Sequence, residues 1–385
     1  MFFLPGDKLS CTNAAKHVIQ LETGVTPINT RPYQLPESQR EEIDLQVKQL
    51  LEDGIIVKGD SAWNSPLLVV PKKVGSDGKL KSRLVVDFRK LNEKTVGDAY
   101  PLPDITEILD QLSHCKYFTC LDMVMGYHQI ELGPGKEPKT AFTTKQSHWE
   151  YRRLPFGLKT TPATFKKMLN SVLSGLRGTR CFVYLDDFVI YARSLVDHST
   201  KLREVLDRLR TYRLKLQPDK CEFLRKDGNY LGHQITEARV RRDPQKVASI
   251  EQFSTPTTAK QLKTFCGLIS YYRRFIPNCG RIASLLYRFL KKDGKFVWTE
   301  TQKNVFQHLK YKLISRPILQ YPDFSKEFIL TTDASNSELG AVLSRGSVAK
   351  DLLVAYASRS YNNAKTHNTN SEKELLAIVW ATKYF

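Results

Sequence analysis

Residues 181–192 read Cys-Phe-Val-Tyr-Leu-Asp-Asp-Phe-Val-Ile-Tyr-Ala and place two adjacent carboxylates, Asp186 and Asp187, between two short apolar runs. Runs of apolar, β-branched and aromatic residues of this length are typical of buried strands, so the stretch predicts a hairpin whose tight turn carries the acidic pair. Aspartate is also common in ordinary hairpin turns, and the dipeptide by itself favours that plainer interpretation. Further carboxylates at strand ends are needed to make this turn a functional site.

A third carboxylate, Asp122, ends another apolar run at residues 118–122 (FTCLD). Three aspartates on adjacent strand ends could hold two Mg²⁺ ions, because this small, hard cation takes oxygen ligands and keeps positions for substrate phosphates. One ion would lower the pKa of an attacking primer 3′-hydroxyl, and the other would neutralise a leaving pyrophosphate. The pattern therefore predicts a phosphoryl-transfer site in which Asp122, Asp186 and Asp187 are the catalytic, metal-binding residues.

Other short boxes lie around the three aspartates in a fixed order along the chain. They are RLVVDFRKLN at residues 83–92, GYHQI at 126–130, LPFGL and PATF at 154–158 and 162–165, YLDD at 184–187 and YLGH at 230–233. Agreement of all these boxes with one family leaves little room for chance. The chain resembles the reverse transcriptase region of a gypsy-type LTR retrotransposon Pol polyprotein, with a truncated ribonuclease H domain at its end.

The resemblance implies an α+β chain with the fingers, palm and thumb of a right-hand polymerase, a connection region and an incomplete α/β ribonuclease H-like unit. We expect an extended lead-in at residues 1–36, fingers and palm at 37–238, thumb and connection helices at 239–321, and the partial ribonuclease H-like domain at 322–385. The residues themselves support the last boundary, because helical apolar periodicity gives way there to short strand-like runs.

The resemblance also assigns roles around the incoming nucleotide. Lys72 and Arg83 would contact the triphosphate, since ammonium and guanidinium groups form charge-assisted bonds with phosphate. The Tyr127 ring would clash with a ribose 2′-hydroxyl and so select dNTPs. Phe156 and Gly157 belong to the box over the nucleotide, where glycine lets the backbone approach closely. A solvated strand residue at Arg83 and a core tyrosine at Tyr127 are the plainer alternatives.

Several features predict contact with nucleic acid. By resemblance, Leu231 and Gly232 would position the primer end, although a plain β-turn fits these residues nearly as well. Lysine and arginine total 59 against 40 aspartates and glutamates, and this net charge of +19 favours a polyanion. Basic stretches at residues 239–242 and 271–274 could bind template phosphates, but a single charged cluster is more often a solvated face. The expected partner is an RNA and DNA template–primer duplex.

Together these features predict an RNA-directed DNA polymerase that is also DNA-templated and adds dNTPs to a primer 3′-hydroxyl. The expected cofactor is Mg²⁺, two ions per polymerase site, with Mn²⁺ as a substitute. Two alternatives belong to other classes: a catalytically inactive, nucleic-acid-binding remnant of a retroelement, and a non-enzymatic component of a retroelement particle. The intact aspartates argue against the first alternative for the polymerase half, whereas the truncated ribonuclease H domain argues partly for it. No feature of the sequence supports the second alternative.

A second acidic pair lies near the end of the chain. Residues 331–335 (TTDAS) close an apolar run, and residues 371–377 (SEKELLA) have helical character. They resemble the start of a ribonuclease H domain, with Asp333 and Glu374 as its first two metal ligands. Two-metal hydrolysis needs more carboxylates than these. The family supplies them downstream of Phe385, so the chain is expected to lack ribonuclease H activity.

The sequence also predicts where the protein acts. No apolar run approaches the roughly 20 residues that span a bilayer, and residues 1–6 are too short for a signal-peptide core. Seven scattered cysteines without a C-x-x-C pair suggest neither a disulfide framework nor a zinc site. We expect an intracellular protein without a membrane partner, located in cytoplasmic retroelement particles.

Overall fold

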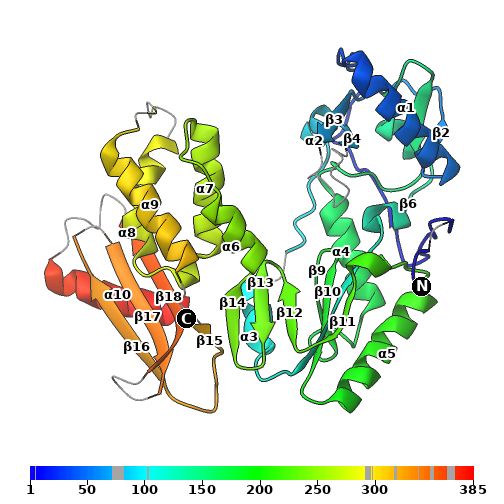
Figure 1. The fold of residues 1–385 in the computed structure, drawn as a ribbon. Helices are drawn as coiled ribbons and strands as arrows, with labels where there is room; N and C mark the ends of the chain where they lie inside the picture. The colour runs from blue at the N-terminus through cyan, green and yellow to red at the C-terminus, as the bar shows by residue number, and fades with distance from the viewer. Residues whose placement is uncertain are drawn as a thin grey trace. The chain divides into compact units, whose positions relative to one another are not determined.

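The structure is a computed structural model that describes residues 1–4, 6–71, 82–101, 104–290, 296, 298–315, 319–336, 338–346, 351–361 and 369–385. The chain divides into two compact units. Unit 1 comprises Met1–Asp104 and Tyr117–Arg225, and unit 2 comprises Ile105–Lys116 and Lys226–Phe385. Each unit combines helices with small sheets (Figure 1).

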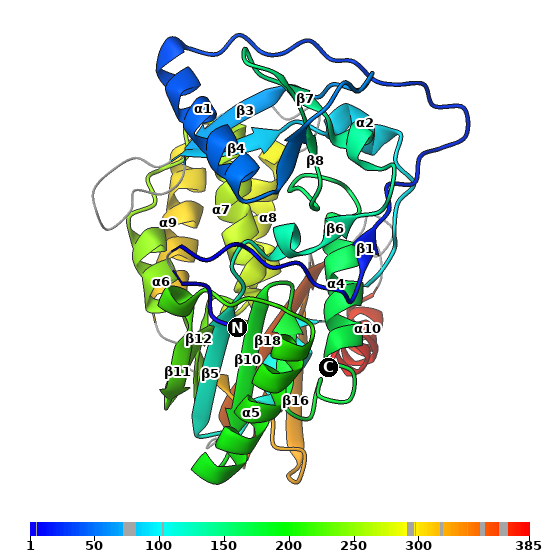
Figure 2. The same ribbon diagram turned by 90° about the vertical axis from the view of Figure 1, so that its right-hand side faces the viewer.

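Part of unit 1 is built on a four-stranded antiparallel sheet in the order β11 (Glu222–Arg225), β5 (Tyr117–Asp122), β10 (Asp187–Ala192) and β9 (Cys181–Tyr184). Helix α5 (Leu195–Thr211) lies along these strands in Figure 2. Leu121 and Phe188 lie in one hydrophobic core with residues of α5 and of α4 (Thr161–Val172). Because strand side chains alternate between faces, Asp122 and Asp187 project from the opposite face of the sheet.

The other part of unit 1 carries three further groups of elements. These are α1 (Glu37–Glu52), the sheet of β2 (Ile56–Lys58), β8 (His148–Tyr151) and β7 (Phe142–Thr143), and the hairpin of β3 (Leu67–Pro71) and β4 (Ser82–Val86), which is followed by α2 (Arg89–Glu93). Residues 72–81, and with them the predicted nucleotide contact Lys72, lie outside the described residues.

The N-terminal segment of unit 1 is mostly irregular but is anchored at β1 (Lys16–His17). This strand pairs in parallel with β6 (Glu131–Leu132). His17 is fully buried, and its Nδ1 lies 2.8 Å from the Thr164 hydroxyl on α4. Burial lowers the pKa of His17 to about 4, so the imidazole is neutral at physiological pH. The contact ties the segment to the helix that covers the central sheet.

Unit 2 contains α3 (Ile105–Gln111) and a second antiparallel sheet, in the order β12 (Asp227–Tyr230), β13 (His233–Thr236), β14 (Arg239–Arg242) and β15 (Leu319–Gln320). The sequence box at residues 230–233 forms the turn between β12 and β13, since Tyr230 pairs with His233. The basic stretch at residues 239–242 forms β14. Arg242 is buried there and donates to the Lys312 carbonyl at 3.0 Å.

Helices make up the middle of unit 2: α6 (Pro244–Glu251), α7 (Ala259–Tyr271), α8 (Cys279–Tyr287) and α9 (Glu300–Ile314). Thr258 with Gln261 and Thr299 with Gln302 form capping boxes that begin α7 and α9. Phe265 of α7 and Phe306 of α9 pack with ring centroids 4.5 Å apart. Short 3₁₀ turns complete the two units at η1 (Gly126–Gln129), η2 (Glu137–Thr140), η3 (Pro218–Lys220), η4 (Arg273–Phe275) and η5 (Arg288–Leu290).

The chain ends in a three-stranded antiparallel sheet, β16 (Phe328–Ala334), β17 (Glu338–Arg345) and β18 (Leu352–Ser360), with α10 (Asn370–Tyr384). Ala381 of α10 packs on Ala341 and Ala357 of one sheet face. The start of α8 meets the other face, where the Gly280 N–H donates to the Ser358 hydroxyl at 2.7 Å. Within the part of the chain that the structure describes, no helix has both the length and the apolar character needed to cross a membrane.

Candidate active site

The three aspartates predicted to bind metal lie together at one end of the central sheet of unit 1. Asp187 begins β10 and lies directly across from Asp122 on β5 and from Tyr184 on β9. Leu185 and Asp186 form the turn, and Leu185 has a φ of 56° in the left-handed region. A side chain there crowds its own backbone at a cost of roughly 1–2 kcal/mol. This turn leaves Asp186 exposed to solvent.

Burial and mutual repulsion dominate the electrostatics of these carboxylates. Burial, followed by the charges of Asp186 and Asp122, raises the pKa of Asp187 to about 6. Burial also raises the pKa of Asp122, whereas Lys220 on η3, with its Nζ 3.1 Å from Asp122 Oδ1, acts to lower it. Like charges directly across a strand pair destabilise that pair. A cation between the carboxylates would therefore stabilise this end of the sheet.

The chemistry of this donor set fits Mg²⁺, although the side chains do not already form a cage. Among the described residues, no three His, Cys, Asp or Glu side chains converge closely enough to hold an ion unaided. Mg²⁺ is commonly bound by one or two carboxylates, with waters and substrate phosphates completing its coordination. Asp122, Asp186 and Asp187 provide such carboxylates at neighbouring strand ends. The Lys220 ammonium group beside Asp122 offsets part of their negative charge.

Three residues predicted to contact the nucleotide form one cluster in unit 1. The Arg83 guanidinium on β4 lies 5.4 Å from the centre of the Phe156 ring. The Tyr127 ring on η1 lies 5.0 Å from Phe156 and 5.0 Å from Phe165 of α4. Burial raises the pKa of Tyr127, and the charge of Asp186 adds to the increase. The cluster therefore lies near enough to Asp186 for the charge of that carboxylate to act on Tyr127.

The loop that carries Phe156 and Gly157 is held by a residue to which the sequence assigned no role. Gly157 has a φ of 93°, a conformation that favours glycine. Asn92 at the end of the box at residues 83–92 donates to the Gly157 carbonyl at 2.7 Å and accepts from the Lys159 N–H at 2.7 Å. Its place in that box was the only available signal, because the chain separates the partners by 65 residues.

The predicted primer contacts, Leu231 and Gly232, form the two-residue turn of the β12–β13 hairpin in unit 2. Their φ angles are 49° and 70°, so both residues adopt the left-handed conformation that such a short hairpin turn requires. Glycine accepts this conformation easily, whereas leucine does so only where its surroundings hold it. The conformation of Leu231 therefore indicates that surrounding contacts in unit 2 hold this turn in place.

The second predicted acidic pair, Asp333 and Glu374, lies in unit 2 on β16 and α10. Both residues are exposed, and Asp333 lies across from Gly340 on β17. They share a neighbourhood, because burial and then the charges of Glu374, Asp333 and Glu338 raise the pKa of Tyr361. Among the described residues, no carboxylate of β17 lies directly across from Asp333 on β16. In unit 1, by contrast, Asp122 lies directly across from Asp187.

Glu338 is a buried carboxylate beside Asp333 that the sequence did not single out. It is 4% exposed, and its Oε1 lies 3.9 Å from Arg281 Nε on α8. Burial raises its pKa, and the Arg281 charge and a backbone hydrogen bond at Arg281 act in the opposite direction. A carboxylate near the N-terminus of a helix stabilises the helix through a favourable interaction with the helix dipole. Glu338 is thus engaged with the first turn of α8.

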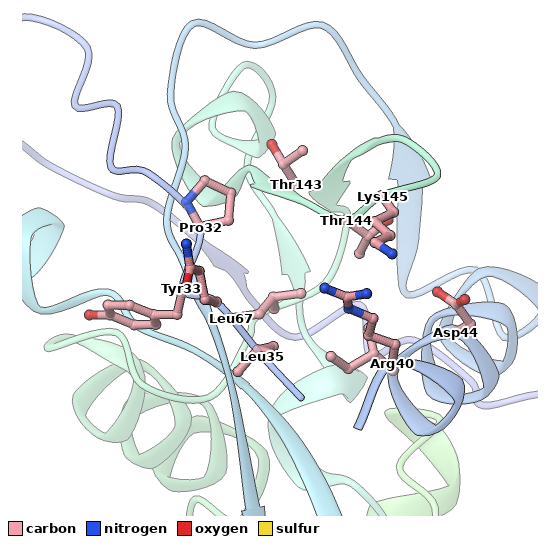
Figure 3. A pocket seen from close by; sticks show the side chains of 11 residues that line it. Pro32, Tyr33, Leu35, Arg40, Asp44, Leu67, Thr143, Thr144 and Lys145 are labelled. Atoms are coloured by element: carbon pink, nitrogen blue, oxygen red, sulfur yellow. The ribbon is translucent and has the colours of Figure 1, made fainter. Parts of the chain in front are cut away.

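Unit 1 also contains a cavity of about 360 Å³ beside α1, into which Arg40 projects (Figure 3). The Tyr33 ring lines it, and the Tyr33 hydroxyl donates to Asp87 at 2.9 Å. Arg40 and Lys145 contribute positive charge, but both pair with Glu37. None of the described residues predicted to bind metal, nucleotide or primer lines this cavity.

Comparison with known proteins identifies the two segments. Residues 70–235 match the family described as reverse transcriptase (RNA-dependent DNA polymerase), and residues 298–385 match the RNase H-like domain found in reverse transcriptase. The retrovirus-related Pol polyprotein from transposon 297 of Drosophila melanogaster is 45% identical over 99% of this chain and 36% of its own length. The Pol polyprotein from transposon gypsy of the same organism is 39% identical over 92% of this chain and 35% of its own length. The chain thus spans about a third of these curated relatives.

A solved structure shows the same fold. The foamy viral protease-reverse transcriptase in complex with RNA/DNA hybrid has a TM-score of 0.83 and 24% identity, over 98% of this chain and 50% of that chain. The likeness confirms the predicted α+β polymerase fold with a ribonuclease H-like unit. The two matched segments, together with the shared fold, define the class of this chain as a polymerase of the reverse transcriptase type. Residues 70–235 therefore carry a reverse transcriptase domain and residues 298–385 an RNase H-like domain, and the relatives of the whole chain named above are retrotransposon Pol polyproteins, transposon gypsy among them.

Proposed function

We propose that this chain is an RNA-directed DNA polymerase that also copies DNA and adds dNTPs to a primer 3′-hydroxyl with two Mg²⁺ ions. The observation that carries the proposal is the placement of Asp187 directly across from Asp122, with Asp186 on the adjoining turn. This arrangement falls within residues 70–235, the segment that matches reverse transcriptases. Mn²⁺ would substitute for Mg²⁺, because it accepts the same oxygen ligands.

Each predicted residue has a task that its surroundings support. The bound ions would activate the primer hydroxyl and neutralise the departing pyrophosphate. Asp122 and Asp186 would be the principal ligands, with Asp187 as the third carboxylate. Arg83, stacked on Phe156, would bind the triphosphate.

Sugar selection would come from the aromatic cluster. The Tyr127 ring is fixed between Phe156 and Phe165, so it would resist displacement by a ribose 2′-hydroxyl. The Asn92 contacts fix the neighbouring backbone of Gly157, which would let the nucleotide approach. Nucleotides without the hydroxyl would therefore be preferred.

The proposed partner is a template–primer duplex of RNA and DNA. The net charge of +19 would attract its phosphates. One protein with the same fold was solved with an RNA/DNA hybrid, and a form of it with double-stranded DNA. Leu231 and Gly232 would hold the primer end. Residence in cytoplasmic retroelement particles remains a prediction.

Cleavage of RNA is not part of the proposed activity of these 385 residues. Two-metal hydrolysis needs more carboxylates than Asp333 and Glu374, and Glu338 beside them is engaged with α8. A labelled RNA–DNA hybrid incubated with the chain and Mg²⁺ tests this expectation. Cleavage that Asp333→Asn abolishes would contradict it.

Primer extension on an RNA template with Mg²⁺ and dNTPs tests the polymerase proposal. The parent should extend the primer, Asp186→Asn should not, and the matched control Asp333→Asn should extend normally. Hybrid binding is measured in parallel. A parent that binds hybrid without extending it would favour the inactive remnant, and a parent that neither binds nor extends would favour the particle component.

A further inference from the structure

The turn of Leu231 and Gly232 is held by two consecutive tyrosines at the end of α7. The Tyr271 hydroxyl donates to the Leu231 carbonyl, and the Tyr272 hydroxyl donates to the Gly232 carbonyl at 2.8 Å. Each carbonyl has a second partner, because His233 Nδ1 lies 2.9 Å from the Leu231 oxygen and the Asp243 N–H donates to Gly232 at 3.1 Å. Both carbonyls of a strained turn are therefore bonded twice.

The tyrosine rings are themselves fixed by aromatic packing. Tyr271 and Tyr272 lie nearly perpendicular, with centroids 4.9 Å apart. The buried His233 ring contacts both of them at 5.5 Å and stacks on Phe275 at 5.8 Å. Tyr272 is 1% exposed, whereas Tyr271 is 42% exposed. The Tyr272 hydroxyl thus belongs to a buried side chain, and the Tyr271 hydroxyl belongs to a partly exposed one.

The fit around the turn is close. A side-chain carbon added at Gly232 would lie 3.1 Å from the Tyr272 hydroxyl. Leu231 remains in a conformation unusual for leucine. Such a conformation persists only where the surrounding contacts determine it. The two hydroxyls supply contacts of that kind directly at the backbone.

We infer that Tyr271 and Tyr272 are positioning residues for the primer end, acting through the backbone of the Leu231–Gly232 turn. This inference rests on the proposed polymerase function and on primer contact by the turn. Their stretch, residues 271–274, then serves the reaction through two phenol hydroxyls and not only through the charges of Arg273 and Arg274. Misplacement of a reacting hydroxyl by a fraction of an ångström slows transfer strongly, since reaction requires near-attack geometry.

Phenylalanine variants separate positioning from folding. Tyr271→Phe, Tyr272→Phe and the double variant keep the rings, and each carbonyl keeps its second partner, so unit 2 should fold. Tyr311→Phe on α9, which is 65% exposed, is the matched control. In single-turnover extension, the burst amplitude counts active enzyme and the rate reports each active site. We expect each single variant to lower the rate about fivefold and the double variant about twentyfold, at unchanged amplitude and dNTP KM.

A second readout does not depend on catalysis. A 2-aminopurine at the primer 3′-terminus reports how that nucleotide is held in the binary complex. The parent should shift its emission relative to free duplex, the double variant should largely lose the shift at saturating duplex, and Tyr311→Phe should retain it. Equal emission for parent and double variant, or reduced amplitude at an unchanged rate, would overturn the inference. If the parent did not extend the primer but its emission still differed from that of the double variant, only the proposed polymerase function would be overturned.

Discussion

Each unit of this chain carries acidic residues that are predicted to bind metal, and the surroundings of the two sets differ. In unit 1, Asp122 and Asp187 lie directly across two antiparallel strands, and burial raises the pKa of each. In unit 2, Asp333 lies across from a glycine, Glu374 projects from a helix, and both are exposed. The difference teaches that strand register and burial, more than the number of acids, create a strong demand for a cation.

Removing one carboxylate from each site should give the largest contrast. Asp122→Asn should lower primer extension by roughly a thousandfold, because a principal metal ligand is lost from the transition state. Glu374→Gln should change extension by less than about twofold. Steady-state extension assays on an RNA template measure both. Equal losses for the two variants would break the comparison.

The aromatic cluster is a further difference between the two sites. Tyr127→Ala should raise incorporation of ribonucleotides relative to deoxynucleotides by about a hundredfold, since the ring that would meet the 2′-hydroxyl is gone. Tyr127→Phe is the matched control, because it keeps the ring and its packing on Phe156 and Phe165. Single-nucleotide insertion kinetics with dNTP and rNTP give the ratio. Unchanged selectivity in the alanine variant would remove Tyr127 from the nucleotide site.

The raised pKa of Asp187 predicts that the stability of unit 1 depends on pH. A carboxyl group with a folded pKa of about 6, above its ordinary value, stabilises the fold fully only at pH below that ordinary value. The contribution is lost as pH rises through about 6. Without metal, Asp187→Asn should therefore raise the melting temperature at pH 7.5 by a few degrees and at pH 4 very little. Thermal denaturation in EDTA measures this.

Mg²⁺ provides the complementary arm of that experiment. It should stabilise the parent more at pH 7.5 than at pH 5, because protons compete for the carboxylates at the lower pH. Asp333→Asn should behave as the parent does. A parent whose melting temperature rises steadily from pH 4 to 7.5 in EDTA, with Asp187→Asn following the same curve, would refute the electrostatic account.

The smallest expected effect concerns Glu338. Glu338→Gln should raise the free energy of unfolding at pH 7.5 by about 1 kcal/mol at most, because burial disfavours the carboxylate more than Arg281 and the first turn of α8 favour it. Extension activity and the Mg²⁺ response should stay at parent values. Urea denaturation measures the stability change. A lost Mg²⁺ response would show that Glu338 is a metal ligand instead.

The fold and much of the site were predictable where signals are local in the chain. The apolar strands, the acidic turn and the order of the boxes all lie within short stretches, and the predicted fold class is confirmed. The assigned roles of the site residues remain predictions. What was missed depends on distant pairs: Lys220 meets Asp122 across 98 residues, and Asn92 meets Gly157 across 65. Side-chain chemistry alone does not reveal such pairs, because register and loop closure decide them.

The most direct test of the account is the location of the metal ions. A crystal of the chain with template–primer, a non-hydrolysable dNTP analogue and Mn²⁺ would reveal the ions by anomalous scattering. The account predicts two anomalous peaks within ligand distance of Asp122 and Asp186, one of them bridging to the triphosphate. An ordered nucleotide with no anomalous peak at these aspartates would contradict it.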